Sequence, residues 1–338
     1  MSNSFSPRLS RLLNRYYEDL RNQAELRAKQ YRTDILKAHP ELSSLEQKLK
    51  KLYVADILSI ASGQEQDNKQ VSTRGRLEIA ELKEQIKQYK HKNKITSLYD
   101  TPAYQCARCS DKGFLTDGQE CVCKRRAIRN VLLKHSRFLP PKAFTFTNFD
   151  SSIFAQELTN EFYNGELSVA QVMTKLAERL QKMAQSEELT PYLLYGYTGV
   201  GKTYLLAALT NQLLDQGVVA LFVTANQLTV LLAQKLKLEA SFNPDMQELD
   251  QCINDYADIV KAKFLVIDDL SATSMSDDER SLLQELLDLR QAEGGITSAT
   301  SNSDLAQLTA VFGERIISRL AGQSTAIEIQ GVDQRQRK

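Results

Sequence analysis

The feature that most constrains the fold is one short segment past the middle of the chain, Gly196-Tyr197-Thr198-Gly199-Val200-Gly201-Lys202-Thr203. It fits the pattern G-x-x-x-x-G-K-[ST] completely. A short apolar stretch, Tyr192–Tyr195, precedes it as a strand, and an apolar helix follows it to about Asp215. Glycines let the backbone turn so that N–H groups face an anion, and the start of a helix favours negative charge. The segment therefore predicts a phosphate-binding loop between a strand and a helix.

The side chains of this loop have predictable roles toward a nucleotide. Lys202 can reach the β- and γ-phosphates, and the Thr203 hydroxyl can ligate Mg²⁺. The residues expected to bind ATP are Gly196, Thr198, Gly199, Val200, Gly201, Lys202, Thr203 and Tyr204. A chance glycine-rich turn is the alternative, but it does not account for the flanking strand and helix.

Two acids follow another apolar stretch, Phe264–Ile267. In a parallel sheet, ligands bind at the carboxyl ends of strands. We therefore expect Asp268 to face Mg²⁺ through water, and Asp269 to orient or deprotonate the attacking water. Alternatively, the two acids only begin a turn. Asn302 ends a further strand-like segment and can hydrogen-bond the γ-phosphate or the water, unless it is a cap.

Strands and helices alternate from Pro191 onward, which predicts an α/β fold with a parallel sheet and helices on both faces. The expected strands are Tyr192–Tyr195, Val219–Thr224, Phe264–Ile267, Ile296–Thr300 and Thr325–Ile329. The expected helices are Lys202–Asp215, Asn226–Lys235 and Ser281–Leu289, with Val169–Met183 before the first strand.

The amino-terminal part of the chain differs in charge and pattern. Residues 1–150 carry 28 Lys and Arg against 17 Asp and Glu, whereas residues 151–338 carry 15 against 25. Leucine and tyrosine stripes predict helices at 7–36 and 41–60, separated at His39-Pro40, and a third helix after a polar loop at 63–72. These stripes serve either internal packing or partner binding. The excess of positive charge in residues 1–150 favours binding to nucleic acid or to an acidic protein surface. The alternative is that these charges are scattered over the surface and contact only solvent.

Four of the five cysteines lie close together, with the spacing Cys106-x2-Cys109-x11-Cys121-x-Cys123. In a cytosolic chain, clustered cysteines are more often metal ligands than disulfides. Four thiolates around Zn²⁺ give a closed, tetrahedral, structural site. Reduced thiols or an iron–sulfur cluster are the alternatives. Cys252 has no metal-ligand neighbours in sequence and is expected to be an ordinary thiol.

Taken together, these motifs resemble the AAA+ ATPase core. The segments Asp268-Asp269-Leu270, Gly313-Glu314-Arg315 and Ser318-Arg319-Leu320 resemble the DnaC/DnaI-type helicase loaders more closely, and the cysteine cluster is similar to the zinc module of Gram-positive members. The resemblance implies Asp269, Asn302 and Arg319 as catalytic residues, with Asn302 as first sensor and Arg319 as arginine finger. Arg315, four residues earlier, is the alternative for the arginine finger. Asp269 stands where glutamate is usual in AAA+ proteins, so hydrolysis is expected to be slow. The chain ends soon after Thr325–Ile329, so no helical lid is expected. Arg335 is a weak candidate for a tail contact to nucleotide.

The resemblance also implies a function. We expect a helical arm at 1–100 that binds the hexameric replicative helicase, a zinc-binding module at 101–137, a joint at 138–190 and the AAA+ domain at 191–338. The expected cofactors are ATP, Mg²⁺ and Zn²⁺, and the expected partners are the helicase, single-stranded DNA and further copies of the chain. The alternatives are a transposase helper ATPase (IstB-like) and a nucleotide-gated binding module with little hydrolysis. With no apolar run of about 20 residues and no secretion signal, we expect a cytoplasmic protein with no membrane contact.

Overall fold

The computed structural model describes residues 5–61, 69–158, 161–186, 188–270, 275–322 and 324–334. They fall into two compact units. One comprises Met1–Tyr16 and Val122–Lys338 and is here called the sheet unit; the other, Tyr17–Cys121, is called the arm unit. Within the described residues, no helix has both the length and the apolar character needed to span a membrane.

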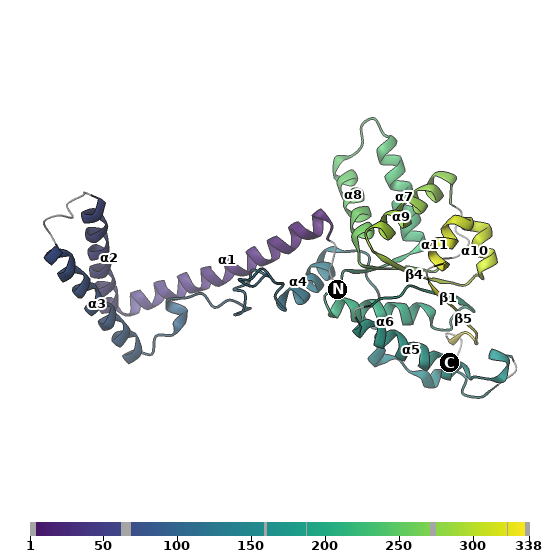
Figure 1. Cartoon of the computed structure of the whole chain (residues 1–338), viewed down its shortest axis with the longest axis horizontal. Helices are drawn as coiled ribbons and strands as arrows, with labels where there is room; N and C mark the ends of the chain where they lie inside the picture. Colours follow the sequence, from purple (N-terminus) through teal and green to yellow (C-terminus); the bar gives the residue numbers. More distant parts are fainter. Residues whose placement is uncertain are drawn as a thin grey trace. The chain divides into compact units, whose positions relative to one another are not determined.

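A parallel sheet of five strands forms the centre of the described sheet unit (Figure 1). The strands are β1 (Tyr192–Gly196), β2 (Ala220–Thr224), β3 (Phe264–Asp268), β4 (Ile296–Ser301) and β5 (Thr325–Ile329), in the order β2-β3-β4-β1-β5. All pairs are parallel, and Leu193 of β1 lies beside Ala299 of β4. The five predicted strands are therefore confirmed. Their continuous apolar runs suit a sheet that is covered on both faces.

Helices cover both faces of this sheet (Figure 1). They are α4 (Cys123–His135), α5 (Val169–Gln185), α6 (Lys202–Asp215), α7 (Ala225–Ala240), α8 (Met246–Lys261), α9 (Asp277–Ala292), α10 (Leu305–Phe312) and α11 (Glu314–Ala321). Capping boxes begin α5, α7, α9 and α10, where a Ser, Thr or Asp side chain accepts the N–H of a Gln or Glu three residues later. Each such cap stabilises its helix by about 1 kcal/mol.

Helices α8 and α10 of the sheet unit were not predicted from the sequence. Helix α8 covers the segment around Cys252, which looked polar because only one face of the helix is apolar: Cys252, Tyr256 and Ile259 are buried on it. Asp245 caps this helix by accepting the N–H groups of Gln247 and Glu248. The eight-residue α10 is shorter than the window over which periodicity is visible.

The beginning of α1 (Pro7–Ala38) is held against α8 within the sheet unit. The guanidinium of Arg8 donates to Asp255 at 2.9 Å and to Asp258 at 3.2 Å, and the Ser6 hydroxyl donates to Asp258. Burial raises the pKa of Asp258, while the bond from Ser6 and the charge of Arg8 oppose that shift. The start of α1 and the helix α8, about 250 residues apart in sequence, are thus joined through two carboxylates.

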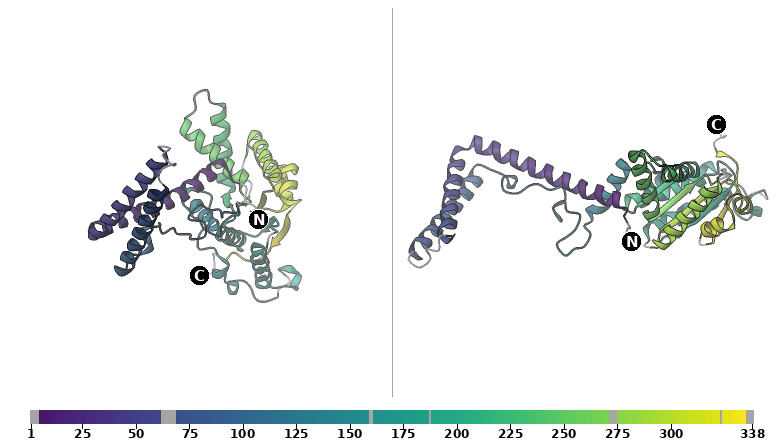
Figure 2. Two further views of the ribbon diagram at one scale, coloured as in Figure 1. Left: turned by 60° about the vertical axis from the view of Figure 1, so that its left-hand side comes forward. Right: turned by 90° about the horizontal axis from the view of Figure 1, so that it is seen from above.

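The three helices predicted in the amino-terminal part of the chain are present. After the main part of α1 come α2 (Pro40–Ala61) and α3 (Lys69–Lys92), which run side by side (Figure 2). Proline begins α2 because its missing N–H is not needed in a first turn. Leu42, Ile86 and Tyr99 are buried in a small core among these helices. The predicted polar loop at 63–72 is corrected at its end, since α3 already begins at Lys69; lysine and glutamine are good helix formers.

Candidate nucleotide site

The glycine-rich segment forms the turn between β1 and α6, as its pattern predicts. Gly196 has a φ of 121°, and a Cβ on it would lie 2.4 Å from the carbonyl oxygen of Ile329 on β5. Gly201 has a φ of 95° and stands at the N-cap of α6. Other residues rarely adopt these angles, so glycine is required at both positions. The loop therefore ends at the N-terminus of a helix, where an anion is stabilised.

Lys202 is nearly buried at the base of this loop, with 5% of its surface exposed. Its ammonium donates to the carbonyl oxygens of Gly196 at 2.9 Å and Tyr197 at 2.5 Å, and to Oδ1 of Asn302 at 2.9 Å. Asn302 is 100 residues away and reaches the lysine because β4 lies beside β1 in the sheet. The only charge on the loop is thus held where phosphate oxygens would approach.

Asp268, the last residue of β3, and Asp269, which follows it, line the same cavity as Lys202. Asp268 is 7% exposed, and burial raises its pKa, whereas hydrogen bonds from Thr300 and Thr203 lower it. Asp269 has a φ of 55°, in the left-handed region, and its Oδ1 accepts the amide N–H of Asn302 at 2.9 Å. A continuous chain of hydrogen bonds therefore links Asp269 through Asn302 to Lys202.

These groups line one cavity of about 470 Å³. Of the residues expected to bind ATP, Mg²⁺ or water, those that line it are Thr198, Gly199, Gly201, Lys202, Thr203, Tyr204, Asp268, Asp269 and Asn302. Gly196 and the buried Val200 support the loop without lining the cavity. Phe144 and Thr300 also line it, and neither was singled out from the sequence. The Phe144 ring packs on Tyr204 with centroids 4.7 Å apart.

The two candidate arginines lie on α11, away from this cavity. Arg319 pairs with Asp288 of α9 through two hydrogen bonds, one of them 3.1 Å from Nη2 to Oδ2. It also donates to the carbonyl oxygen of Arg315. Within the described chain, Arg319 therefore has a carboxylate partner and does not reach its own nucleotide site. Arg335 lies outside the described residues.

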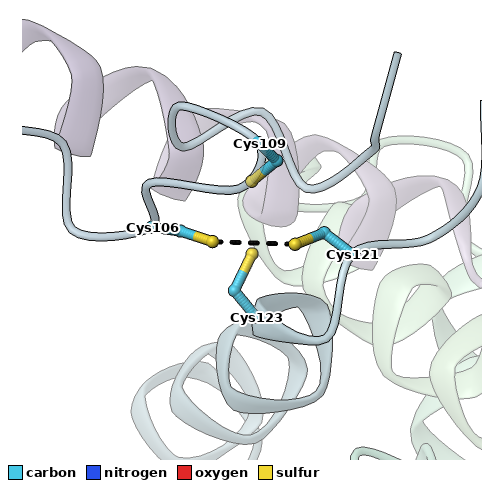
Figure 3. A group of neighbouring side chains, drawn as sticks. All are labelled: Cys106, Cys109, Cys121 and Cys123. Atoms are coloured by element: carbon cyan, nitrogen blue, oxygen red, sulfur yellow. Dashed lines mark hydrogen bonds between the residues drawn. The ribbon is translucent and has the colours of Figure 1, made fainter. Parts of the chain in front are cut away.

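The four clustered cysteines converge, as Figure 3 shows. Their sulfur atoms all lie within 4.8 Å of one another, and Sγ of Cys106 and Cys121 are 3.6 Å apart. A disulfide is about 2.05 Å long, whereas Zn–S bonds of about 2.3 Å in a tetrahedron separate sulfurs by about 3.8 Å. Buried Asp111 supports the loop by accepting the N–H groups of Gln105 and Cys106.

The electrostatics of this cluster also suit a metal. Burial opposes ionisation of the Cys106 thiol, but hydrogen bonds from the backbone and from the Cys121 and Cys109 thiols lower its pKa to about 7. Zinc binds thiolates, so a lowered thiol pKa favours binding at neutral pH. The donor set and spacing therefore fit one zinc ion.

The parallel sheet, the phosphate loop and the acids beside it define an ATP-binding P-loop protein of the AAA+ class. The chain belongs to the family of IstB-like ATP binding proteins, whose model matches residues 160–338. It is 25% identical over 195 residues to the replicative helicase loader DnaC of Escherichia coli K12, covering 57% of this chain and 75% of that protein.

Two further comparisons were found. The ATP-binding protein of insertion sequence IS21 from Pseudomonas aeruginosa is 30% identical over 162 residues, covering 46% of this chain and 57% of that protein. A crystal structure of DnaI is 25% identical, with a TM-score of 0.36, over 55% of this chain and 94% of that chain. The predicted family is confirmed by the family model and by the similarity in sequence to DnaC.

Proposed function

We propose that the protein is an ATP-dependent loader that delivers a hexameric replicative helicase onto single-stranded DNA in the cytoplasm. The observation that carries this proposal is the cavity in which Lys202, Asp268, Asp269 and Asn302 meet. It is supported by the match to the replicative helicase loader DnaC, which covers three quarters of that protein.

In this proposal the loop amides, Lys202 and Thr203 hold the phosphates, and Asp268 holds Mg²⁺ through water. Asp269 orients the attacking water, and Asn302 transmits the state of the γ-phosphate to Lys202 and Asp269, both of which it contacts. Aspartate is one methylene shorter than glutamate, so turnover is slow. Arg319 completes the site of a neighbouring copy in an ATP-bound oligomer, where it stabilises the charge that develops on the phosphates.

The arm binds the helicase. Its helices enclose a groove of about 940 Å³ whose apolar lining includes Leu36, Leu49, Ile86 and Ile95. The acids Glu46 and Asp100 in the groove already pair with Arg32 and Lys90, whereas Lys50 and Lys83 add further positive charge. Lys87 also lines the groove and pairs with Glu84 at 3.9 Å. A groove of this kind suits an acidic, amphipathic helix of the helicase.

Single-stranded DNA and zinc complete the proposal. The cysteine cluster holds one structural Zn²⁺, and Arg125 and Arg126 on the following helix are exposed where they can contact DNA phosphates. Other basic residues of that helix region are already engaged: Arg129 pairs with Asp215 and Arg137 with Asp255.

A second candidate function is a transposase helper, which the IS21 ATP-binding protein favours with the higher identity of 30%. The test is co-purification of the intact protein from its host, with ATP and without it. Recovery of the replicative helicase, changed by ATP, supports the loader. Recovery of a transposase and no helicase supports the helper. A third possibility, a gated module with little hydrolysis, is distinguished by a turnover assay with DNA and partner present.

A further inference from the structure

Thr300 contacts both acids of the nucleotide site through its side chain and has no role in the proposed function. It is the fifth residue of β4 and is 1% exposed. Its hydroxyl accepts the backbone N–H of Asp269 at 2.9 Å and donates to Oδ1 of Asp268 at 2.7 Å. A hydroxyl has one proton, so accepting the N–H leaves that proton committed to the carboxylate.

The backbone of Thr300 adds a third bond, since its carbonyl oxygen accepts the N–H of Leu270 at 2.7 Å. Three consecutive residues, the last of β3 and the two that follow it, thus form hydrogen bonds with one residue of β4. The middle one, Asp269, has a left-handed backbone at a φ of 55°. Such a conformation is unfavourable for residues other than glycine and persists only when neighbouring structure holds it.

The bond to Asp268 has a separate consequence. A carboxylate that ligates Mg²⁺, directly or through water, must present its oxygens in a fixed orientation. The Thr300 hydroxyl donates to one oxygen of the Asp268 carboxylate and therefore limits rotation of that carboxylate about its Cβ–Cγ bond. Asn302, two residues further along, does the same for Asp269 through Oδ1. The end of β4 thus orients both acids.

We propose that Thr300 is a positioning residue for the magnesium–nucleotide complex, and that its hydroxyl orients Asp268 and holds the turn that carries Asp269. It acts through the acids and does not itself contact the metal. The inference rests on the ATP site of the proposed function and is independent of the helicase, DNA and zinc.

The test compares Thr300→Val, which keeps the shape and removes the hydroxyl, with Thr300→Ser, which keeps the hydroxyl. The matched control is Thr210→Val, because Thr210 is equally buried but its hydroxyl only donates to a helix carbonyl, that of Leu206. Affinity for a fluorescent ATP analogue is measured in EDTA and across a Mg²⁺ titration, together with turnover at saturating ATP.

In EDTA, all variants are expected to bind the analogue as the wild type does, because the phosphate loop and Lys202 are unchanged. In the titration, Thr300→Val is expected to need about tenfold more Mg²⁺ and to turn over about tenfold more slowly, as is usual when a partner of a metal ligand is removed. Thr300→Ser is expected to keep the Mg²⁺ requirement and the turnover of the wild type, because it retains the hydroxyl. Thr210→Val is expected to match the wild type in both measurements.

Three results would overturn the inference. They are equal Mg²⁺ dependence of Thr300→Val and Thr210→Val, a Thr300→Ser variant as impaired as Thr300→Val, and loss of binding already in EDTA, which indicates a structural role only. A protein that shows the expected titration but never binds a helicase refutes the loader and leaves this inference standing.

Discussion

At the scale of single residues, the interior of the sheet unit contains a fully buried cation. Arg290 of α9 is 0% exposed, and its guanidinium donates to the carbonyl oxygens of Ile259, Ala262 and Ile296 and to the hydroxyl of Thr297. Burial lowers the pKa of Arg290 to about 9. The acceptors at the end of α8 offset that cost, because carbonyls at a helix C-terminus carry partial negative charge.

We expect Arg290→Lys to lower the free energy of unfolding by at least about 3 kcal/mol, since lysine cannot span these acceptors and buried carbonyls lose their partners. Urea unfolding measures the change. Arg280→Lys on the same helix is the control, because among the described residues Arg280 pairs with the exposed Asp277, and loss of such an exposed ion pair costs less than about 1 kcal/mol. Equal effects of the two changes would contradict this account of Arg290.

At the scale of elements, α11 is joined to α9 by the pair of Arg319 and Asp288. An arginine that completes a neighbouring site must be released from that partner, or reach past it, when copies assemble. The pair is partly exposed, with 32% and 41% of the side chains accessible, so its contribution to stability is small and its rearrangement is feasible.

We expect Arg319→Ala to leave ATP affinity unchanged and to lower turnover at least about tenfold, because in the proposed role this arginine stabilises charge only in the transition state. Asp288→Ala removes the same ion pair but leaves the arginine, so its turnover should be preserved. Turnover at a protein concentration that supports assembly measures both. If both variants lose activity equally, Arg319 acts only through its pair with Asp288.

The loop that carries the cysteines is the second element with a clear prediction. We expect one zinc per chain by metal analysis, and its loss when Cys106 and Cys109 are replaced by Ser, because two of four ligands no longer form thiolates. Cys252→Ser should keep the metal, since Cys252 is buried on α8 and is not a member of the cluster. Iron in place of zinc, or no metal in the wild type, would contradict the assignment.

At the scale of the whole molecule, partner binding and ATP binding are proposed for different units. The arm unit has its own small core, so changes on its exposed lysines should not disturb the nucleotide cavity. The groove of the arm unit can therefore be tested in the full-length protein with ATP binding as an internal check on folding.

We expect Lys50→Glu with Lys87→Glu to weaken helicase recovery about tenfold, because two positive charges on the groove become negative against an acidic partner. Lys48→Glu is the matched control, since Lys48 is exposed on the same helix but does not line the groove. Pull-down at several salt concentrations measures the change. Equal losses for Lys48 and the groove pair would place the helicase elsewhere.

Short motifs were sufficient to predict the phosphate loop, the strand before it, the two acids after β3 and the clustered cysteines. These features depend on residues that are close in sequence. The phosphate loop needs glycine conformations and the start of a helix, and the cysteine cluster needs ligands on one short loop. The parallel α/β class also followed, because alternation of strands and helices leaves few other arrangements.

Tertiary structure decided which of these residues meet. Strand order places β4 between β3 and β1, and so brings Asn302 to Lys202 and Thr300 to both acids, across 31 to 100 residues of chain. Packing of distant elements also places Phe144 in the cavity, pairs Asp288 with Arg319, and brings Arg290 to the carbonyl oxygens at the end of α8. Such contacts depend on how distant elements pack, and no local pattern of residues encodes them.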